Sequence, residues 1–224
     1  MNITKQETQE TETTQPQELL IQTATDILQY RMNNAHGDRR YIETQEEKIS
    51  HLLIERNLDT KNLPPALSGI LLESLFFLQM QELNIPIECS TGEYDMQGID
   101  FFLFDDFIPI DVTSNTNSQK IASKLRRETS TVLFLPKFPR QQVIGQYSGR
   151  KHILEAYINR ELSKDRYLTT MLSVNTEFKQ ILIENLTHRN VHHPEFRIKK
   201  VKNRDIAKLD HILHRFSRRL EQFQ

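Results

Sequence analysis

The sequence GIDFFLFDDFIPIDVT, residues 98–113, contains two short apolar runs on either side of the acidic pair Asp105-Asp106. Both runs are rich in the aromatic and β-branched residues that are typical of strands. An acidic pair between two such runs suits a two-residue hairpin loop, although Asn-Gly or Asp-Gly would be a stronger turn signal. We therefore predict an antiparallel hairpin formed by residues 98–104 and 107–113.

The register of this hairpin places two aspartates opposite each other. If the acidic pair forms the loop, Asp100 faces Asp111 across the strands. Directly opposed residues have Cβ atoms ~5 Å apart, and like charges at that spacing destabilise the pair. A slip of one residue would move the two carboxylates to different faces. The other face of the hairpin is entirely apolar and is expected to be buried. Its residues are Ile99, Phe101, Leu103, Ile108, Ile110 and Val112.

Two close carboxylates indicate a cation site. A hard divalent cation neutralises them, and Mg²⁺ typically takes one or two carboxylates together with water and substrate phosphates. We therefore interpret Asp100 and Asp111 as candidate metal ligands. The alternative is that both lie on a solvated sheet face. Phe102 and Phe104, which share that face, indicate that it is partly covered.

The segments around the hairpin predict an α/β (α+β) core. Residues 65–83 are hydrophobic on nearly all sides, as in a helix buried against a sheet. A strand is expected at 85–90, followed by a turn at Thr91-Gly92, and a short basic amphipathic helix at 119–129 precedes a buried strand at 131–136. Further helices are expected over residues 18–31, 44–56, 152–162, 167–186 and 205–223.

The chain is expected to divide into four segments. The first, residues 1–16, is rich in Gln, Thr and Glu and is predicted to be a disordered polar tail. Residues 17–62 form N-terminal helices, 63–150 the helix-strand-strand-strand-helix-strand core, and 151–224 a basic helical region.

The charge is unevenly distributed, although the formal net charge is only −1. Acidic residues predominate before residue 60, whereas Lys and Arg predominate after residue 187. This asymmetry favours an anionic partner at one surface; the alternative is a solvated helical face. The candidate contacts to nucleic-acid phosphates are Lys199, Lys200, Lys202 and Arg204.

Composition also excludes several classes of protein. Cys89 is the only cysteine, which rules out a disulfide framework or cysteine-rich zinc site within the chain and favours a reducing cytoplasm. The sequence has no apolar run long enough to span a bilayer and no signal-peptide pattern. We therefore expect a cytoplasmic protein without a membrane partner.

The order of these elements and the positions of the acidic residues resemble the PD-(D/E)xK nuclease superfamily over about residues 65–136. Glu73 lies on the expected buried helix, Asp100 fills the first acidic position of the hairpin and Asp111 the second. The resemblance implies a restriction-endonuclease-like core that hydrolyses phosphodiesters with Mg²⁺ or Mn²⁺ held by these three residues. Glu73 has the alternative role of a capping or paired carboxylate within the core.

One departure from the family concerns its lysine, which should follow the second acid by two residues, where this chain has Thr113. Viral cap-snatching endonucleases resemble this arrangement and carry the lysine on the next helix. Lys120 and Lys124 lie one helical turn apart there, on the same side as Arg127. Either lysine is a candidate catalytic residue, and Arg127 is a candidate nucleic-acid contact. If neither lysine reaches the site, the chain is expected to be an inactive relative that binds nucleic acid.

The resemblance also implies the partner and the chemistry. Nucleic acid is the expected substrate, with DNA favoured over RNA. The sequence does not decide whether the protein forms a homodimer. A metal would polarise the phosphodiester and lower the pKa of bound water, while a lysine would stabilise charge. Glu93, Asp95 and His36 are weaker candidates for additional ligands. Two alternatives remain: a catalytically inactive nucleic-acid-binding or assembly protein with the same fold, and a helical interaction protein whose hairpin is structural.

Overall fold

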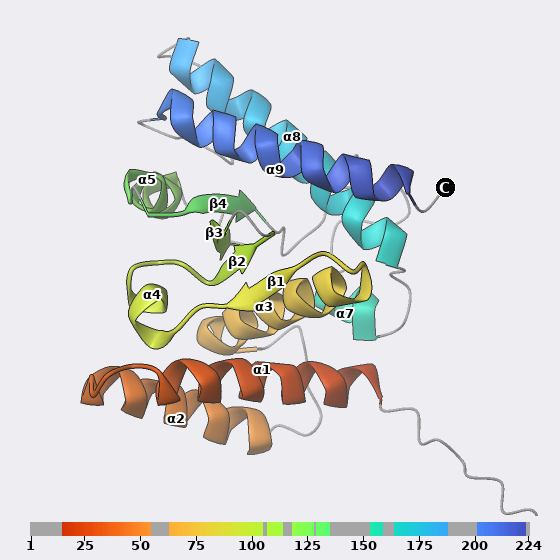
Figure 1. Ribbon diagram of the computed structural model, residues 1–224. Coiled ribbons are helices and arrows are strands. Elements are labelled where there is room, and N and C mark those ends of the chain that lie inside the picture. Colours follow the sequence, from red (N-terminus) through yellow and green to blue (C-terminus); the bar gives the residue numbers. More distant parts are fainter. Residues whose placement is uncertain are drawn as a thin grey trace, which may run out of the picture.

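The protein is a mixed α/β structure in which a four-stranded sheet lies among helices (Figure 1). The computed structural model describes residues 15–54, 63–104, 107–113, 118–127, 129–134, 153–158, 164–187 and 201–222. Across these ranges, no helix combines the length and the apolar character needed to cross a membrane.

The sheet has the order β1-β2-β3-β4. Its strands are β1 (Ile87–Cys89), β2 (Phe101–Leu103), β3 (Ile108–Thr113) and β4 (Thr131–Phe134). The first three strands are antiparallel neighbours, whereas β4 lies parallel to β3. A parallel pair needs a crossover connection, and the helix α5 (Ser118–Arg126) lies within it.

The expected hairpin register is confirmed. Phe101 pairs with Ile110 and Phe102 pairs with Pro109. Phe101 and Ile110 are fully buried, as predicted for the apolar face. The expected loop residues, 105 and 106, lie outside the described part of the chain. The residues on either side of them, Phe104 and Phe107, have positive φ angles of 59° and 48°.

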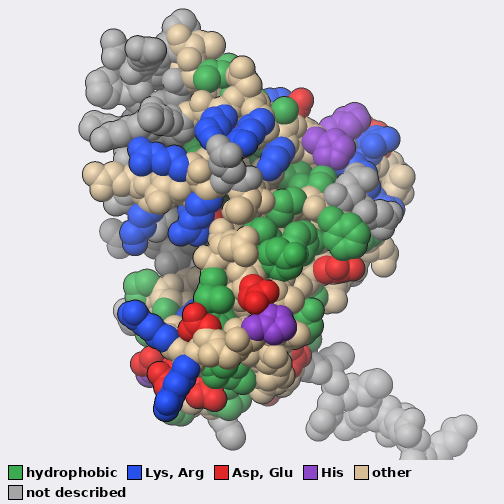
Figure 2. Space-filling model, turned by 60° about the vertical axis from the view of Figure 1, so that its left-hand side comes forward, with side chains coloured by type: hydrophobic (Ala, Val, Ile, Leu, Met, Phe, Trp, Pro, Cys, Tyr) green, Lys and Arg blue, Asp and Glu red, His purple; other side chains and the backbone are tan. Residues whose placement is uncertain are grey.

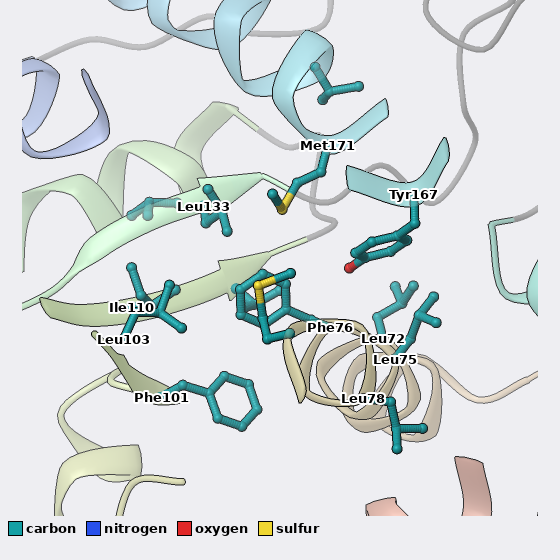
Figure 3. Close-up of a cluster of buried hydrophobic side chains, with 14 of the residues drawn as sticks. Leu72, Leu75, Phe76, Leu78, Phe101, Leu103, Ile110, Leu133, Tyr167 and Met171 are labelled. Carbon is teal, nitrogen blue, oxygen red and sulfur yellow. The ribbon is translucent and has the colours of Figure 1, made fainter. Parts of the chain in front are cut away.

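The core lies between the sheet and two helices, α3 (Pro65–Glu82) and α8 (Lys164–Thr187). Figure 3 shows side chains from these helices and from the strands pointing toward one another. The ring of Phe76 on α3 lies 5.9 Å, centroid to centroid, from that of Phe101 on β2. Helix α3 is buried on most sides, as its uniformly apolar sequence predicts.

The remaining helices flank this core. α1 (Pro16–Asn33) packs against both α2 (Arg39–Ile54) and α3, and α9 (Asn203–Glu221) packs against α8 and β4 (Figure 1). The short helix α7 (Ile153–Ile158) contacts α1 and α3.

The structure corrects several expected boundaries. Residues 92–96 form a short helix, α4 (Gly92–Met96), where the sequence predicted a turn. Glycine is required at its first position, because a Cβ atom on Gly92 would lie 2.5 Å from the carbonyl oxygen of Arg31. Strand β2 begins at Phe101 instead of residue 98, and α2 begins at Arg39 instead of residue 44. Helix ends depend on capping and packing that periodicity does not specify.

Replacing Phe76 by alanine should destabilise the fold strongly. The side chain is fully buried against β2, and truncation of a buried phenylalanine costs about 3–5 kcal/mol. Chemical denaturation followed by circular dichroism measures this loss. Ile54→Ala is the control, because that side chain is 78% exposed. Equal midpoints for the two variants would contradict the described core.

Candidate functional site

Hydrogen bonds hold Asp100 in place immediately before β2. The Asp100 amide donates a hydrogen bond to the Ile110 carbonyl oxygen at 2.7 Å, and its own carbonyl oxygen accepts one from the Ser90 amide at 3.2 Å. The Asp100 carboxylate accepts a hydrogen bond from the Val112 amide at 2.6 Å. Asp100 is therefore anchored to both neighbouring segments by its backbone and by its side chain.

Asp111 lies on β3 and is fully buried. Burial raises the pKa of Asp100 well above its ordinary value. The nearby carboxylates of Glu73 and Asp111 raise it further. One oxygen of Asp111, Oδ2, is buried and finds no hydrogen-bond partner among the described residues. A buried, unpaired carboxylate oxygen is costly, so this atom is suited to a cation or a bound water.

Lys124 neutralises Asp111 from helix α5. Its ammonium group donates a hydrogen bond to the other carboxylate oxygen, Oδ1. Helix α5 is amphipathic, with Ile121 and Leu125 buried, and this orientation directs Lys124 toward β3. Lys120, one turn earlier, is exposed. The structure therefore brings one of the two candidate lysines to Asp111.

Arg127, just after α5, lies on the same side. Its charge lowers the pKa of Asp111, although burial has the larger effect and raises it. The guanidinium group lies against Gly98, where a Cβ atom would approach Arg127 Nη1 to 2.4 Å. Gly98 has a φ of +81°, a backbone conformation that favours glycine. Arg127 thus adds a second cation near the carboxylates.

Arg31, on α1, is the residue that sequence analysis missed. Its Nη1 atom lies 2.8 Å from Glu73 Oε2 and 3.2 Å from Asp95 Oδ1, and its Nη2 atom donates a hydrogen bond to the Asp100 carbonyl oxygen at 2.9 Å. The side chain is only 3% exposed. It also lies over the Phe101 ring, with Cζ 5.5 Å from the centroid.

A signal for Arg31 exists in the sequence. Arg31 continues the helical stripe of Leu20, Ala24 and Leu28, all of which are buried. A charged residue on the apolar stripe of a helix is expected to have a buried partner. The partners come from α3 and α4 and could not be identified from spacing alone. Tyr41 was also missed; its hydroxyl donates a hydrogen bond to Asp95 Oδ2 at 2.7 Å.

Burial shifts the titration of the acidic residues. The pKa of Glu73 is raised by burial, against the opposing effect of Arg31, and that of Asp111 is raised by burial, against the opposing effect of Lys124. Four carboxylates, those of Glu73, Asp95, Asp100 and Asp111, thus lie near three cations, Arg31, Lys124 and Arg127. The cluster accumulates negative charge that a further cation would relieve.

The donor set fits a divalent metal in part. Asp100 and Asp111 supply two carboxylates, and Asp111 Oδ2 is unpaired, which suits a hard cation. Glu73, the third expected ligand, is engaged by Arg31. Within the described ranges, no group of three or more His, Cys, Asp or Glu side chains is arranged to hold a metal ion. Metal binding would therefore use the aspartate pair, or would require Glu73 to leave Arg31.

The other candidate residues have the following exposures and partners. His36 is 76% exposed, and its Nε2 atom is 3.9 Å from Glu93. Asp95, a weaker metal candidate, binds Arg31 instead. Lys202 and Arg204 are exposed at the beginning of α9. Lys199 and Lys200 fall outside the residues that the structure describes.

Comparisons with protein-family models, with curated proteins and with solved structures found no match for this chain.

Replacing Arg31 by glutamine should destabilise the protein by about 3–5 kcal/mol, because breaking a buried ion pair leaves uncompensated buried charge. Glu73 and Asp95 would both lose their cation. Arg39→Gln is the matched control, since Arg39 pairs with Glu43 on the surface and such pairs contribute about 1 kcal/mol or less. Urea denaturation of both variants measures the difference. Equal losses would show that the Arg31 cluster is not a structural centre.

The raised pKa of Asp100 predicts a pH dependence of stability. In the unfolded chain this aspartate titrates near pH ~3.9, whereas burial raises its pKa in the folded protein. Its contribution to stability is therefore complete below about pH 3.9 and is lost as pH rises through the folded pKa. As the pH rises from about pH 4, Asp100→Asn should lose less stability than the wild type in EDTA. The exposed Asp26→Asn variant should follow the wild type. Parallel profiles for Asp100→Asn and the wild type would contradict this.

Proposed function

We propose that this chain is a metal-dependent nuclease of the PD-(D/E)xK type, which hydrolyses phosphodiester bonds of nucleic acid. The observation that carries the proposal is the contact between Lys124 and Asp111. The family lysine is absent at Thr113, and the ammonium group of Lys124 reaches the second acidic position from the following helix instead.

The arrangement of elements supports the same proposal. Helix α3, which carries Glu73, precedes the antiparallel β1-β2-β3 segment, and α5 then leads to β4, parallel to β3. A restriction-endonuclease-like core has this order of helix, three strands, helix and strand. The short helix α4 is an insertion between β1 and β2.

The residues divide the chemistry between them. Mg²⁺ or Mn²⁺ held by Asp100 and Asp111 would supply Lewis-acid polarisation of the phosphate and a bound water of lowered pKa. Lys124 places a positive charge beside Asp111, where it can stabilise the charge that develops on the phosphoryl oxygens. Arg127 can hold a neighbouring phosphate. Arg31 keeps Glu73 and the Asp100 backbone in position.

A second candidate function is that of an inactive nucleic-acid-binding or assembly protein with the same core. The observation that favours it is the engagement of Glu73 by Arg31. A guanidinium group at this position partly neutralises the acidic cluster without a metal. The two candidates differ in whether a divalent cation binds at the aspartates.

Variants of one acid and two lysines separate the two candidates. Asp111→Asn keeps the side-chain shape and should abolish Mn²⁺-dependent cleavage. Lys124→Ala should lower kcat about 100-fold or more, the loss typical for removal of a charge-stabilising group. Lys120→Ala, one turn away and exposed, is the matched control and should cleave like the wild type. The assay uses labelled DNA and RNA with Mg²⁺, Mn²⁺ or EDTA.

Two outcomes would count against the nuclease. Equal activity of the two lysine variants would remove the role proposed for Lys124. Wild-type protein that binds nucleic acid but cleaves neither DNA nor RNA with either metal would support the inactive binding protein. Calorimetric titration with Mn²⁺ then shows whether the aspartates bind a metal at all. Any heat of Mn²⁺ binding to the wild type should be absent in Asp111→Asn.

A further inference from the structure

Three aromatic rings from different elements form a row on the surface beside the acidic cluster. Tyr94 on α4 lies 5.3 Å from Phe102 on β2, and Phe102 lies 6.3 Å from Phe107, between ring centroids. The interplanar angles of 83° and 65° mean that the rings meet edge to face and do not stack on one another. Tyr94 is 44% exposed and Phe107 is 60% exposed. We call these three residues the aromatic row.

The row begins next to the candidate active site. Phe102 lies two residues after Asp100, and alternation along the strand directs both side chains to the same face of the sheet. Phe102 also pairs across the hairpin with Pro109, two residues before Asp111. A ligand on the row would therefore lie over the face of the sheet that carries the two aspartates.

Phe107 is the member of the row that the fold explains least. Its φ of 48° is an unfavourable conformation for a bulky residue, and its exposed ring gains little from burial. Glycine or asparagine would suit this backbone better. An exposed aromatic side chain in an unfavourable conformation indicates a role in binding.

Positive charges lie on segments next to the row. The guanidinium group of Arg215, on α9, lies 4.2 Å from the centroid of the Phe104 ring, and the Phe107 amide donates a hydrogen bond to the Phe104 carbonyl oxygen. Lys124 and Arg127 lie near Asp111, which is on the same strand as Pro109, the partner of Phe102. Figure 2 shows hydrophobic side chains exposed in the middle of one face of the molecule, with Lys and Arg side chains gathered above them and to the left and Asp, Glu and His side chains below them. Aromatic rings beside cationic groups match a ligand with flat bases and anionic phosphates.

We propose that the aromatic row binds single-stranded nucleic acid, with unpaired bases stacking on Tyr94 and Phe107 and the backbone directed to the aspartates. This inference deepens the proposed function, on which the cleavage step rests, by naming a single strand as the substrate. In a duplex the faces of the bases are covered by their neighbours, so the row would have no ring to contact. Stacking accepts any base, which predicts binding with little sequence preference.

The test measures binding without cleavage. A short fluorescein-labelled oligodeoxythymidylate, and the same strand annealed to its complement, are titrated with the full chain in EDTA and followed by fluorescence anisotropy. The wild type should bind the single strand more tightly than the duplex. Phe107→Asn removes the ring while suiting the backbone, so it should fold and bind the single strand about tenfold more weakly.

Two controls isolate the stacking contribution. Phe107→Tyr keeps an aromatic ring and should retain wild-type affinity. Ile54→Asn removes an exposed apolar side chain from α2, far along the chain, and should also bind like the wild type. Tyr94→Ala provides an independent variant at the other end of the row and should weaken binding by a similar factor.

The inference is overturned if Phe107→Asn and Tyr94→Ala bind the single strand as the wild type does, or if the duplex binds more tightly. It is also overturned if the wild type binds neither and sediments as a dimer that Phe107→Asn converts to a monomer, since the row would then contact protein.

These results can be distinguished from failure of the nuclease proposal. Single-strand binding that depends on Phe107, without cleavage in any metal, supports binding by the aromatic row and contradicts the nuclease proposal. Cleavage that is unchanged when Phe107 is replaced supports the nuclease proposal and contradicts binding by the aromatic row.

Discussion

The structure depends on one buried guanidinium group. Arg31 contacts Glu73 on α3, Asp95 on α4 and the backbone of Asp100 at the beginning of β2. Its own helix, α1, lies outside the sheet, so a single side chain connects an N-terminal helix to three elements of the core (Figure 1). Burying such a charge is costly, and only several well-placed acceptors offset the cost. The position of Glu73 and the path of the chain into β2 therefore depend on α1.

Electrostatic compensation organises the rest of the site. Lys124 and Arg31 each neutralise one side of a cluster that contains four carboxylates. The compensation is incomplete, because the Oδ2 atom of Asp111 is buried without a donor among the described residues. Such local imbalance is common at sites that bind a charged ligand. It provides the physical basis for proposing a cation here, and the basic residues around it provide the basis for proposing an anionic polymer.

Part of this site was predictable from local sequence. The pairing of Phe101 with Ile110 follows from the period-2 pattern on either side of residues 105–106, and it brings Asp100 and Asp111 together. The choice between Lys120 and Lys124 was not predictable. Both lie on the same helical stripe, and only the position of α5 in the folded chain shows that Lys124 is the residue that contacts Asp111. The helix α4 was missed because its five residues are too short for a periodic signal.

The sequence by itself determined the class of structure, the hairpin and its register, and the acidic pair, because each of these depends on residues close together in the chain. Only the tertiary structure decided the partners of Glu73 and Asp95, since Arg31 reaches them from a helix far away in sequence. It likewise assembled Tyr94, Phe102 and Phe107 into one row from α4, β2 and the turn before β3. The physical reason is that helical periodicity predicts whether a charged or aromatic side chain is buried or exposed. The residues that it contacts are determined by how whole helices and strands pack together.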